Sequence, residues 1–184
     1  LIMLIIPLWY IIIMLILIWI WPKTLPSSFW SALRARLNRV ASWETLTGLL
    51  SNLGYNVVAA DIDQEKLNHF NGKLIQKRVI DLENINNWPL EKKKFNAIIV
   101  TNFLNRKIFP SIIKSIKKEG YLIYETFSEG HQKIGRPTNP KYILKPRELL
   151  RLSNKMQLVA YENIYINNPS NHLFQQRILA KNVW

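Results

Sequence analysis

From residue 45 to the end of the chain, short apolar runs alternate with segments whose apolar residues recur at helical spacing. This alternation constrains the fold more than any other feature, because strands alternating with helices build a mostly parallel sheet with helices on both faces. The runs are short enough to be strands buried on both faces. Strands are expected at 56–61, within 73–82, within 95–104 and at 121–127, and helices at 46–55, 64–70, 110–118 and 146–152.

The last two apolar runs, 156–163 and 174–182, are separated by a connection too short for a crossover helix. They predict an antiparallel strand pair at one edge of the sheet. Residues 136–146 read RPTNPKYILKP and are expected to form a loop. The expected fold class is therefore α/β, with a mostly parallel sheet, helices on both faces and an antiparallel terminal strand.

Single residues mark several helix boundaries. Gly54 is expected to end the first helix, and Asp63 to cap the start of the second. Pro110 is expected to open the third helix and Gly120 to close it.

Ligands in such sheets bind beyond the carboxyl ends of the parallel strands. The residues that follow the expected strands are therefore the candidates for a functional site. They are Asp61, Asp81, Thr101–Phe103 and Glu125–Phe127.

The first 22 residues contain no charged side chain. As a helix, residues 1–21 would span about 30 Å, the thickness of a bilayer core. We therefore expect an N-terminal hydrophobic helix and a candidate transmembrane segment at 1–21. The basic residues between 22 and Glu44 predict that the C-terminal domain faces the cytoplasm. Candidates for interfacial anchors are found among Trp9, Tyr10, Trp19 and Trp21.

Two other interpretations of this segment remain open. One is an uncleaved or partial targeting segment. A cleaved signal peptide fits less well, because the run lacks a basic beginning and PKTLPSS (22–28) is a poor cleavage site. Alternatively, a shifted reading frame or truncated gene supplies residues 1 to about 44. Residues 22–44 are accordingly interpreted as a linker or as the degraded start of the domain that occupies 45–184.

The composition limits which classes of partner, metal site and catalytic nucleophile the chain can have. The formal charge is +13, but the basic residues are dispersed, and the richness in Lys, Asn and Ile is expected of an AT-rich genome. Nucleic acid is therefore not the favoured partner, although a module that binds nucleic acid or anionic lipid remains an alternative. The absence of cysteine excludes disulfides, thiolate metal sites and a cysteine nucleophile. The three histidines show no metal-ligand spacing, so no metal site is expected.

Four segments carry a resemblance to a known family. They are NVVAADID (56–63), IDLENINNWPLEKKKFNAIIVTNFL (80–104), GYLIYETF (120–127) and GRPTNPKYILKPRELL (135–150). In order and spacing they resemble the small class I S-adenosylmethionine (SAM)-dependent methyltransferases, especially the tellurite-resistance-like branch. The resemblance covers the chain from about Thr45 to its end. It implies a Rossmann-like methyltransferase domain at 45–184, SAM as the cofactor and a small-molecule methyl acceptor.

The resemblance assigns the cofactor-binding residues after the second and third strands. Asp61 corresponds to the acid that accepts hydrogen bonds from the ribose hydroxyls, and Ile62 would pack on the adenine ring. Asp81 corresponds to the acid that binds the adenine amino group, and the backbone at Leu82 helps to read the ring. Two alternatives stay open, since Asp61 could cap the next helix and Asp81 could belong to a solvated turn.

The segments after the fourth and fifth strands correspond to the methionine and acceptor side. Thr101, Asn102 and Phe103 would contact the methionine part of SAM and the substrate. Glu125 and Tyr124 are candidates for catalytic groups. The alternatives are local backbone bonding for Asn102, core packing for Phe103 and an ion pair between Glu125 and a basic neighbour such as Arg136.

The chain departs from the family at the glycine-rich turn after the first strand. Counting back from Gly54, the equivalent stretch is 36–50, where no strand is recognisable. The two glycine positions fall near Ser42 and Glu44, with Trp43 between them. Side chains there would occupy the space of the cofactor, and Glu44 would repel its carboxylate. The sequence therefore predicts weak SAM binding or none, with a non-catalytic methyltransferase remnant as the alternative function.

Overall fold

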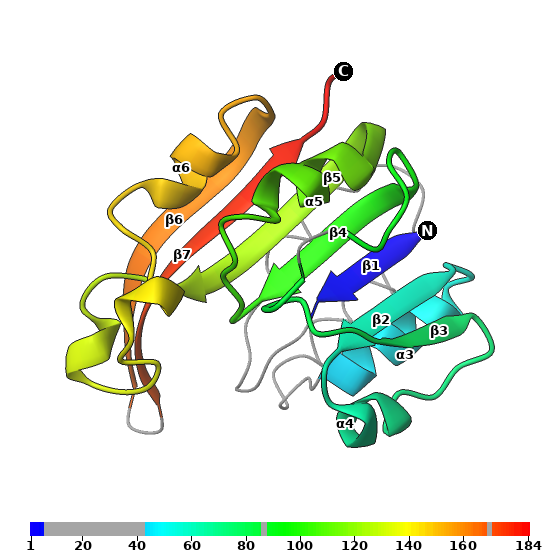
Figure 1. Cartoon of the computed structure of the whole chain (residues 1–184), viewed down its shortest axis with the longest axis horizontal. Helices are drawn as coiled ribbons and strands as arrows, with labels where there is room; N and C mark the ends of the chain where they lie inside the picture. Colours follow the sequence, from blue (N-terminus) through cyan, green and yellow to red (C-terminus); the bar gives the residue numbers. More distant parts are fainter. Residues whose placement is uncertain (6–42, 86–87, 169–170) are drawn as a thin grey trace.

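The computed structural model describes residues 1–5, 43–85, 88–168 and 171–184. Its described part contains a seven-stranded sheet of order β3-β2-β1-β4-β5-β7-β6 (Figure 1). The strands β1 to β5 pair in parallel, whereas β7 is antiparallel to both β5 and β6. The mostly parallel sheet with an antiparallel terminal strand is therefore confirmed. The strands are β1 (Ile2–Ile5), β2 (Val57–Asp61), β3 (Ile75–Val79), β4 (Phe95–Thr101), β5 (Ile116–Phe127), β6 (Gln157–Asn168) and β7 (Asn171–Lys181).

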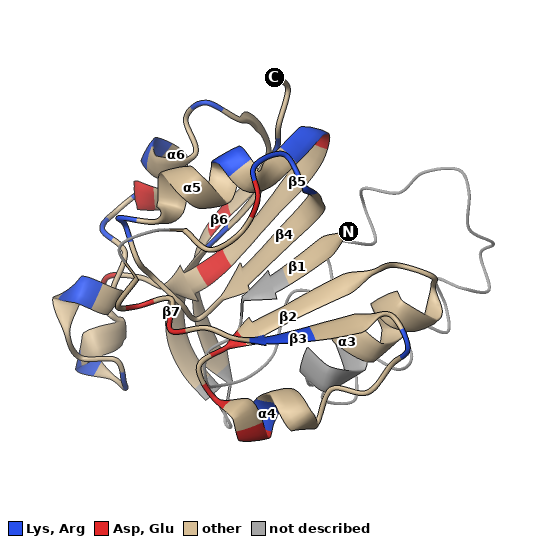
Figure 2. Ribbon diagram, turned by 45° about the vertical axis from the view of Figure 1, so that its right-hand side comes forward, with Lys and Arg blue, Asp and Glu red and all other residues tan. Residues whose placement is uncertain are grey.

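Helices cover both faces of the sheet (Figures 1 and 2). The helices α3 (Trp43–Asn52) and α4 (Gln64–Asn68) pack on the face that includes Val57 and Ala59. The helices α5 (Phe109–Ser115) and α6 (Glu148–Leu152) pack on the other face. Because successive strand residues point to opposite faces, the two faces have separate apolar clusters. Two short 3₁₀ turns occupy His131–Lys133 and Pro140–Tyr142 within the loops.

The second helix begins and the first ends as expected. Asp63 caps α4, since its side chain accepts hydrogen bonds from the backbone N–H groups of Glu65 and Lys66. Gly54 follows α3 with a φ of +86°, a conformation that glycine adopts without strain.

The third helix is shorter than the expected 110–118. It ends at Ser115, and Ile116 already pairs with Phe95 as the first residue of β5. The side-chain amide of Asn182 donates hydrogen bonds to the carbonyl groups of Ile116 and Lys117, which satisfies backbone groups that a helix would have used. The role expected for Gly120 was wrong, because it lies within β5 and not at a helix end.

The chain's first residues form the centre of the sheet. Strand β1 pairs in parallel with β2 on one side and with β4 on the other, and Met3 is fully buried. The expected N-terminal hydrophobic helix is therefore wrong for Ile2–Ile5. A strand buried on both faces is a continuous apolar run, so its composition resembles that of a membrane helix.

The other predictions for the first 44 residues fall mostly outside the described residues. Residues 6–42 are not described, and with them most of the candidate membrane segment 1–21 and of the linker 22–44. No helix in the described part of the chain is long and apolar enough to cross a membrane. The sheet includes Ile2–Ile5, which lies outside the predicted domain of 45–184.

Truncation of Met3 tests the central position of β1. Met3→Ala is expected to lower the free energy of unfolding by about 2–5 kcal/mol, because it leaves a cavity in a fully buried site. The control Leu158→Ala removes a side chain that is 51% exposed and should change stability by less than about 0.5 kcal/mol. Urea denaturation measures both. Equal effects of the two substitutions would show that β1 does not occupy the core.

Candidate functional site

The carboxyl ends of β2, β3, β4 and β5 meet at one edge of the sheet because these strands are parallel. Asp61 ends β2 opposite Val79, and Thr101 ends β4 opposite Glu125. Asp81 follows β3. Acidic segments lie along this edge of the ribbon (Figure 2). The structure therefore brings the predicted site residues to a common rim.

Asp61 is buried at the end of β2, with only 4% of its surface exposed. One carboxylate oxygen, Oδ1, accepts a hydrogen bond of 2.8 Å from the backbone N–H of Asp63. The other, Oδ2, is buried without a hydrogen-bond partner. Burial raises the pKa of Asp61 above its ordinary value. Because an unpartnered buried acceptor is costly, Oδ2 is a candidate to accept a hydrogen bond from a ligand.

The two residues that follow Asp61 show whether its side chain caps the next helix or is left for a ligand. The cap of α4 is Asp63, so Asp61 does not have the capping role left open for it. Ile62 is 62% exposed, although it is apolar. Ile62 thus leaves an aliphatic side chain open to contact at the carboxyl end of β2.

Asp81 uses its carboxylate to hold a local turn. Oδ1 accepts from the backbone N–H groups of Glu83 and Asn84, and Oδ2 accepts from the Asn84 side chain at 2.7 Å. The Asn84 hydrogen bond lowers the pKa of Asp81. These contacts match the alternative in which Asp81 belongs to a turn. The side chain of Leu82 is buried in the core, so a ligand would meet its backbone.

The segment after β4 turns sharply away from the sheet. Thr101 is fully buried and its hydroxyl has no hydrogen-bond partner. Asn102 has a φ of +48°, in the left-handed region, and its N–H donates to the Glu125 carbonyl at 2.8 Å. The Phe103 side chain is buried, and its carbonyl accepts a hydrogen bond from the Tyr124 hydroxyl at 2.7 Å. The fully buried Tyr124, whose pKa is raised by burial, thus supports this turn from within the core.

Glu125 lies in a row of charged residues across β5, β7 and β6. Arg177 is opposite Glu125 on one side and opposite Glu162 on the other. Arg177 Nε lies 2.5 Å from Glu125 Oε2, and the partner is thus Arg177 and not the expected Arg136. Burial raises the pKa of Glu125 to about 7, although the Arg177 charge acts in the opposite direction. A carboxyl group with this pKa can exchange protons near neutral pH.

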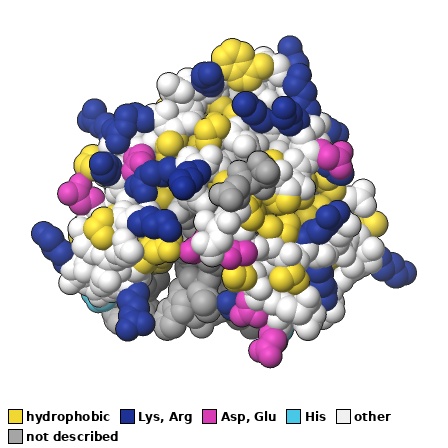
Figure 3. All heavy atoms as spheres, viewed as in Figure 1, with side chains coloured by type: hydrophobic (Ala, Val, Ile, Leu, Met, Phe, Trp, Pro, Cys, Tyr) yellow, Lys and Arg dark blue, Asp and Glu magenta, His cyan; other side chains and the backbone are white. Residues whose placement is uncertain are grey.

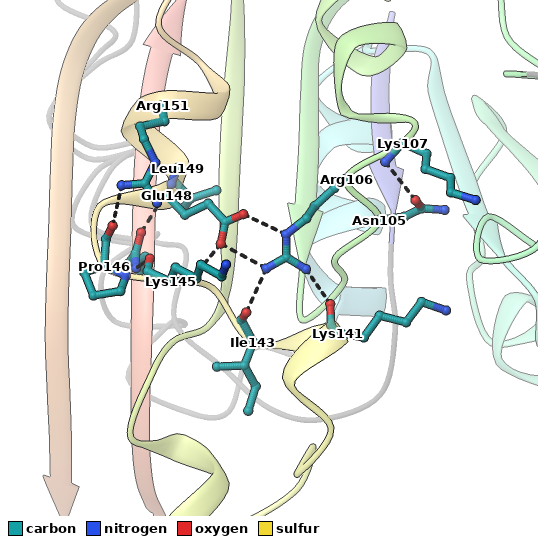
Figure 4. Close-up of polar contacts among 11 residues, drawn as sticks. Asn105, Arg106, Lys107, Lys141, Ile143, Lys145, Pro146, Glu148, Leu149 and Arg151 are labelled. Carbon is teal, nitrogen blue, oxygen red and sulfur yellow. Dashed lines mark hydrogen bonds and ion pairs between the residues drawn. The ribbon is translucent and has the colours of Figure 1, made fainter.

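Arg106 and Glu148 form a clamp that no pattern in the sequence indicates (Figure 4). Arg106 donates to both carboxylate oxygens of Glu148, from Nε at 2.7 Å and from Nη2 at 2.9 Å. It also donates to the carbonyl groups of Lys141 and Ile143. Glu148 in turn accepts from the Lys145 N–H at 2.7 Å. The fork of one guanidinium thus holds the loop 136–148 against the segment that follows β4.

A second set of contacts joins these loops to the one after β3. The Asn105 side chain donates to the carbonyl groups of Leu82 and Glu83. The Tyr142 hydroxyl donates to the Glu83 carboxylate at 2.9 Å. Because Asn105 and Arg106 are adjacent, the three loops at the carboxyl edge form one connected rim. No signal in the sequence singles out these pairs, since each joins residues far apart along the chain.

The structure corrects the position of the first strand but leaves the glycine-poor turn untested. The first strand, which is not recognisable within 36–50, is β1 (Ile2–Ile5) at the centre of the sheet. Trp43 and Glu44 belong to α3, and Ser42 lies outside the described residues. No group of three or more His, Asp or Glu residues in the described part of the chain has a metal-binding arrangement.

Comparison with known proteins gives a fold likeness without a sequence match. No family model matches the chain. No curated protein matches it at a significant level either. Solved structures of SAM-dependent methyltransferases, in contrast, share its fold. Since their sequence identities are low, this likeness establishes the class I methyltransferase fold and leaves the activity to be proposed.

Three of these structures illustrate the likeness. TehB from Haemophilus influenzae is 16% identical with a TM-score of 0.55, over 76% of this chain and 54% of that protein. A SAM-dependent methyltransferase from Methanosarcina mazei is 14% identical with a TM-score of 0.53, over 73% and 85%. The geranyl diphosphate C-methyltransferase from Streptomyces coelicolor A3(2) is 13% identical with a TM-score of 0.52, over 73% and 65%. The chain thus spans about half the length of TehB.

Replacement of Arg106 tests the clamp. Arg106→Ala is expected to lower the free energy of unfolding by about 2 kcal/mol, because Glu148 and two carbonyl groups lose their donor. Arg106→Lys keeps the charge but not the fork and should have an intermediate effect. The neighbouring exposed Lys107→Ala is the control. Urea denaturation in which Arg106→Ala behaves like Lys107→Ala would contradict the clamp.

The raised pKa of Glu125 predicts a distinct pH dependence of stability. The unfolded carboxyl group loses its proton near its ordinary pKa of 4.5, whereas the folded one keeps it until about pH 7. The stabilisation is therefore complete below pH 4.5 and is lost as the pH rises to 7, by about 3 kcal/mol. The difference between wild type and Glu125→Gln in urea denaturation isolates this contribution from those of Asp61 and His131.

The control for this pH experiment is Glu129→Gln, which removes an exposed carboxylate from the following loop. It reports the effect of one charge alone. A stability difference between wild type and Glu125→Gln that stays constant from pH 4.5 to 7 would contradict the raised pKa.

Proposed function

We propose that this chain is a SAM-dependent methyltransferase that acts on a small-molecule acceptor. The observation that carries the proposal is the unpartnered, buried Oδ2 of Asp61 beside the exposed Ile62. Both lie at the carboxyl end of β2 in a class I methyltransferase fold. Ribose hydroxyl groups would supply the hydrogen-bond donor that Asp61 lacks, and the adenine ring would cover Ile62.

The other cofactor contacts follow from the rim. Asp81 and the backbone at Leu82 would lie at the adenine edge, although Asp81 already accepts three hydrogen bonds within its turn. Thr101, whose buried hydroxyl lacks a partner, would lie on the methionine side. Asn102 and the backbone of Phe103 would line the same side. The Phe103 side chain would not contact the cofactor, since it is buried.

The bound cofactor would supply a methyl group activated for in-line displacement, and the protein would supply alignment and exclusion of water. Glu125 lies next to Thr101 across β4 and β5 and is the residue that we assign to the acceptor side. With a pKa of about 7, it would hydrogen-bond the acceptor or take its proton. We assign no such role to Tyr124, since its hydroxyl is fully buried and donates to the Phe103 carbonyl.

The acceptor is proposed to be a small molecule by analogy of fold. The Streptomyces coelicolor enzyme was solved with geranyl diphosphate, Mg²⁺ and S-adenosylhomocysteine. In the described part of this chain, no group of three or more His, Asp or Glu residues is arranged to hold a metal ion. The likeness therefore supports the size class of the acceptor and not its chemical identity.

Calorimetric titration of the full chain with SAM tests the proposal. Asp61→Ala is expected to weaken binding by about tenfold to a hundredfold, because two charge-assisted hydrogen bonds to the ribose are lost. Asp61→Asn keeps an acceptor oxygen and should weaken binding less. The matched control is Asp63→Ala, which removes the cap of α4 at a cost of about 1 kcal/mol in stability but touches no proposed ligand contact.

Two results would count against the proposal. If the wild-type chain is folded but does not bind SAM, the chain is a methyltransferase remnant, as the missing glycine-rich turn predicts. If SAM binds and Asp61→Ala binds equally well, the cofactor does not occupy the end of β2.

A further inference from the structure

Lysine residues gather at the opposite edge of the sheet, where the parallel strands begin. The turn 91–94 lies against the end of α5, since the N–H groups of Lys93 and Lys94 donate to the carbonyl groups of Lys114 and Ser115. The next residues of the chain, at the start of β5, carry two more lysines. We define the amino-edge cluster as the exposed residues Lys92, Lys93, Lys114, Lys117, Lys118 and Lys155.

The carboxylates at this edge are already used. Glu91 is paired with Lys94, and Glu119 is paired with Lys181. In the described residues, none of the six lysines of the amino-edge cluster has an ion-pair partner. The other acidic side chains described above lie on the carboxyl rim or in the row of Glu125. The edge is therefore a concentrated positive surface even though the basic residues are dispersed in the sequence.

Exposed apolar side chains lie at the same edge. The register of β6 shifts between Leu158 and Ala160, and both Leu158 and Val159 are about half exposed beside this irregularity. Strand β7 ends here as well, followed by Val183 and Trp184, and Trp184 is 60% exposed.

Backbone and side-chain contacts connect the apolar residues to the lysines. The Asn182 side chain donates to the Lys117 carbonyl, and the Glu119 N–H donates to the Asn182 carbonyl. Gln157, next to Leu158, pairs with Lys181. Hydrophobic and basic side chains lie side by side at the upper end of the molecule, where the C-terminus is found (Figures 1 and 3).

We propose that this amino edge binds the surface of an anionic lipid membrane. Lysine clusters are attracted to acidic headgroups, and tryptophan and aliphatic side chains enter the interfacial layer. Nucleic acid fits less well, because the exposed Leu158, Val159 and Trp184 beside the lysines would have no apolar layer to enter on a duplex. The binding mode is peripheral and uses only described residues, so it does not depend on the candidate membrane segment at 1–21.

This surface leaves the proposed cofactor site accessible. The site lies at the carboxyl ends of the same strands, so docking through the amino edge would direct the rim away from the lipid. Membrane binding and SAM binding are then separate properties, and each can fail without the other.

Vesicle co-sedimentation of the full chain tests the proposal. The chain should bind phosphatidylcholine vesicles that contain phosphatidylserine more tightly than pure phosphatidylcholine vesicles, and more weakly at high salt. The triple variant Lys114→Gln, Lys117→Gln, Lys118→Gln should bind the acidic vesicles about a hundredfold more weakly, at about fivefold for each lysine. Trp184→Ser should weaken the binding that remains at high salt.

The matched control is Lys73→Gln, Lys77→Gln, Arg78→Gln, which removes the same charge from exposed positions in and beside β3. It should bind the acidic vesicles nearly as tightly as the wild type. Equal losses in the two triple variants, equal binding to both kinds of vesicle, or tighter binding to a DNA duplex than to the acidic vesicles would each overturn the proposal. Circular dichroism of each variant checks that the fold is retained.

Discussion

Backbone hydrogen bonding along both edges of β1 holds the two parts of the sheet together. Four residues pair with β2 on one side and with β4 on the other. Without these residues, the strands β2 and β3 would not be hydrogen-bonded to the rest of the sheet, which β4 begins. Both apolar clusters also include a β1 side chain, Met3 on one face and Ile2 on the other. The alignment of the carboxyl ends, and hence the rim, depends on this short strand.

Patterns within short windows predicted most of the sheet. The runs that became β2 and β4 are apolar and end in polar residues, and the terminal strand pair was indicated by its short connection. Asp63 was identified as a helix cap because its hydrogen bonds are local in sequence. These features depend on neighbouring residues and are therefore visible without a structure.

Features that depend on distant residues were not predictable. Ile2–Ile5 is followed by 37 residues that the structure does not describe, and its composition is shared by strands and membrane helices. The end of α5 depends on Asn182, which lies more than 60 residues later. The partner of Glu125 was misassigned because Arg136 is nearer in sequence, whereas the sheet register brings Arg177 opposite it. Long-range register thus decides which charges meet.

The charged row across β5, β7 and β6 has a physical consequence for any ligand near it. Arg177 is 7% exposed, and its charge is shared between Glu125 and the more exposed Glu162. Removing two charges from water costs free energy, so a buried ion pair is weak evidence that the pair serves stability alone.

Near this pair, the Thr101 hydroxyl and the Gln175 side-chain nitrogen are buried without partners. These polar groups come from β4, β5 and β7, whereas Asp61 comes from β2, so a bound cofactor and its acceptor would be held by different parts of the sheet. If the chain binds SAM as proposed, substitutions in β5–β7 are expected to act on the acceptor side and to leave Asp61 unchanged.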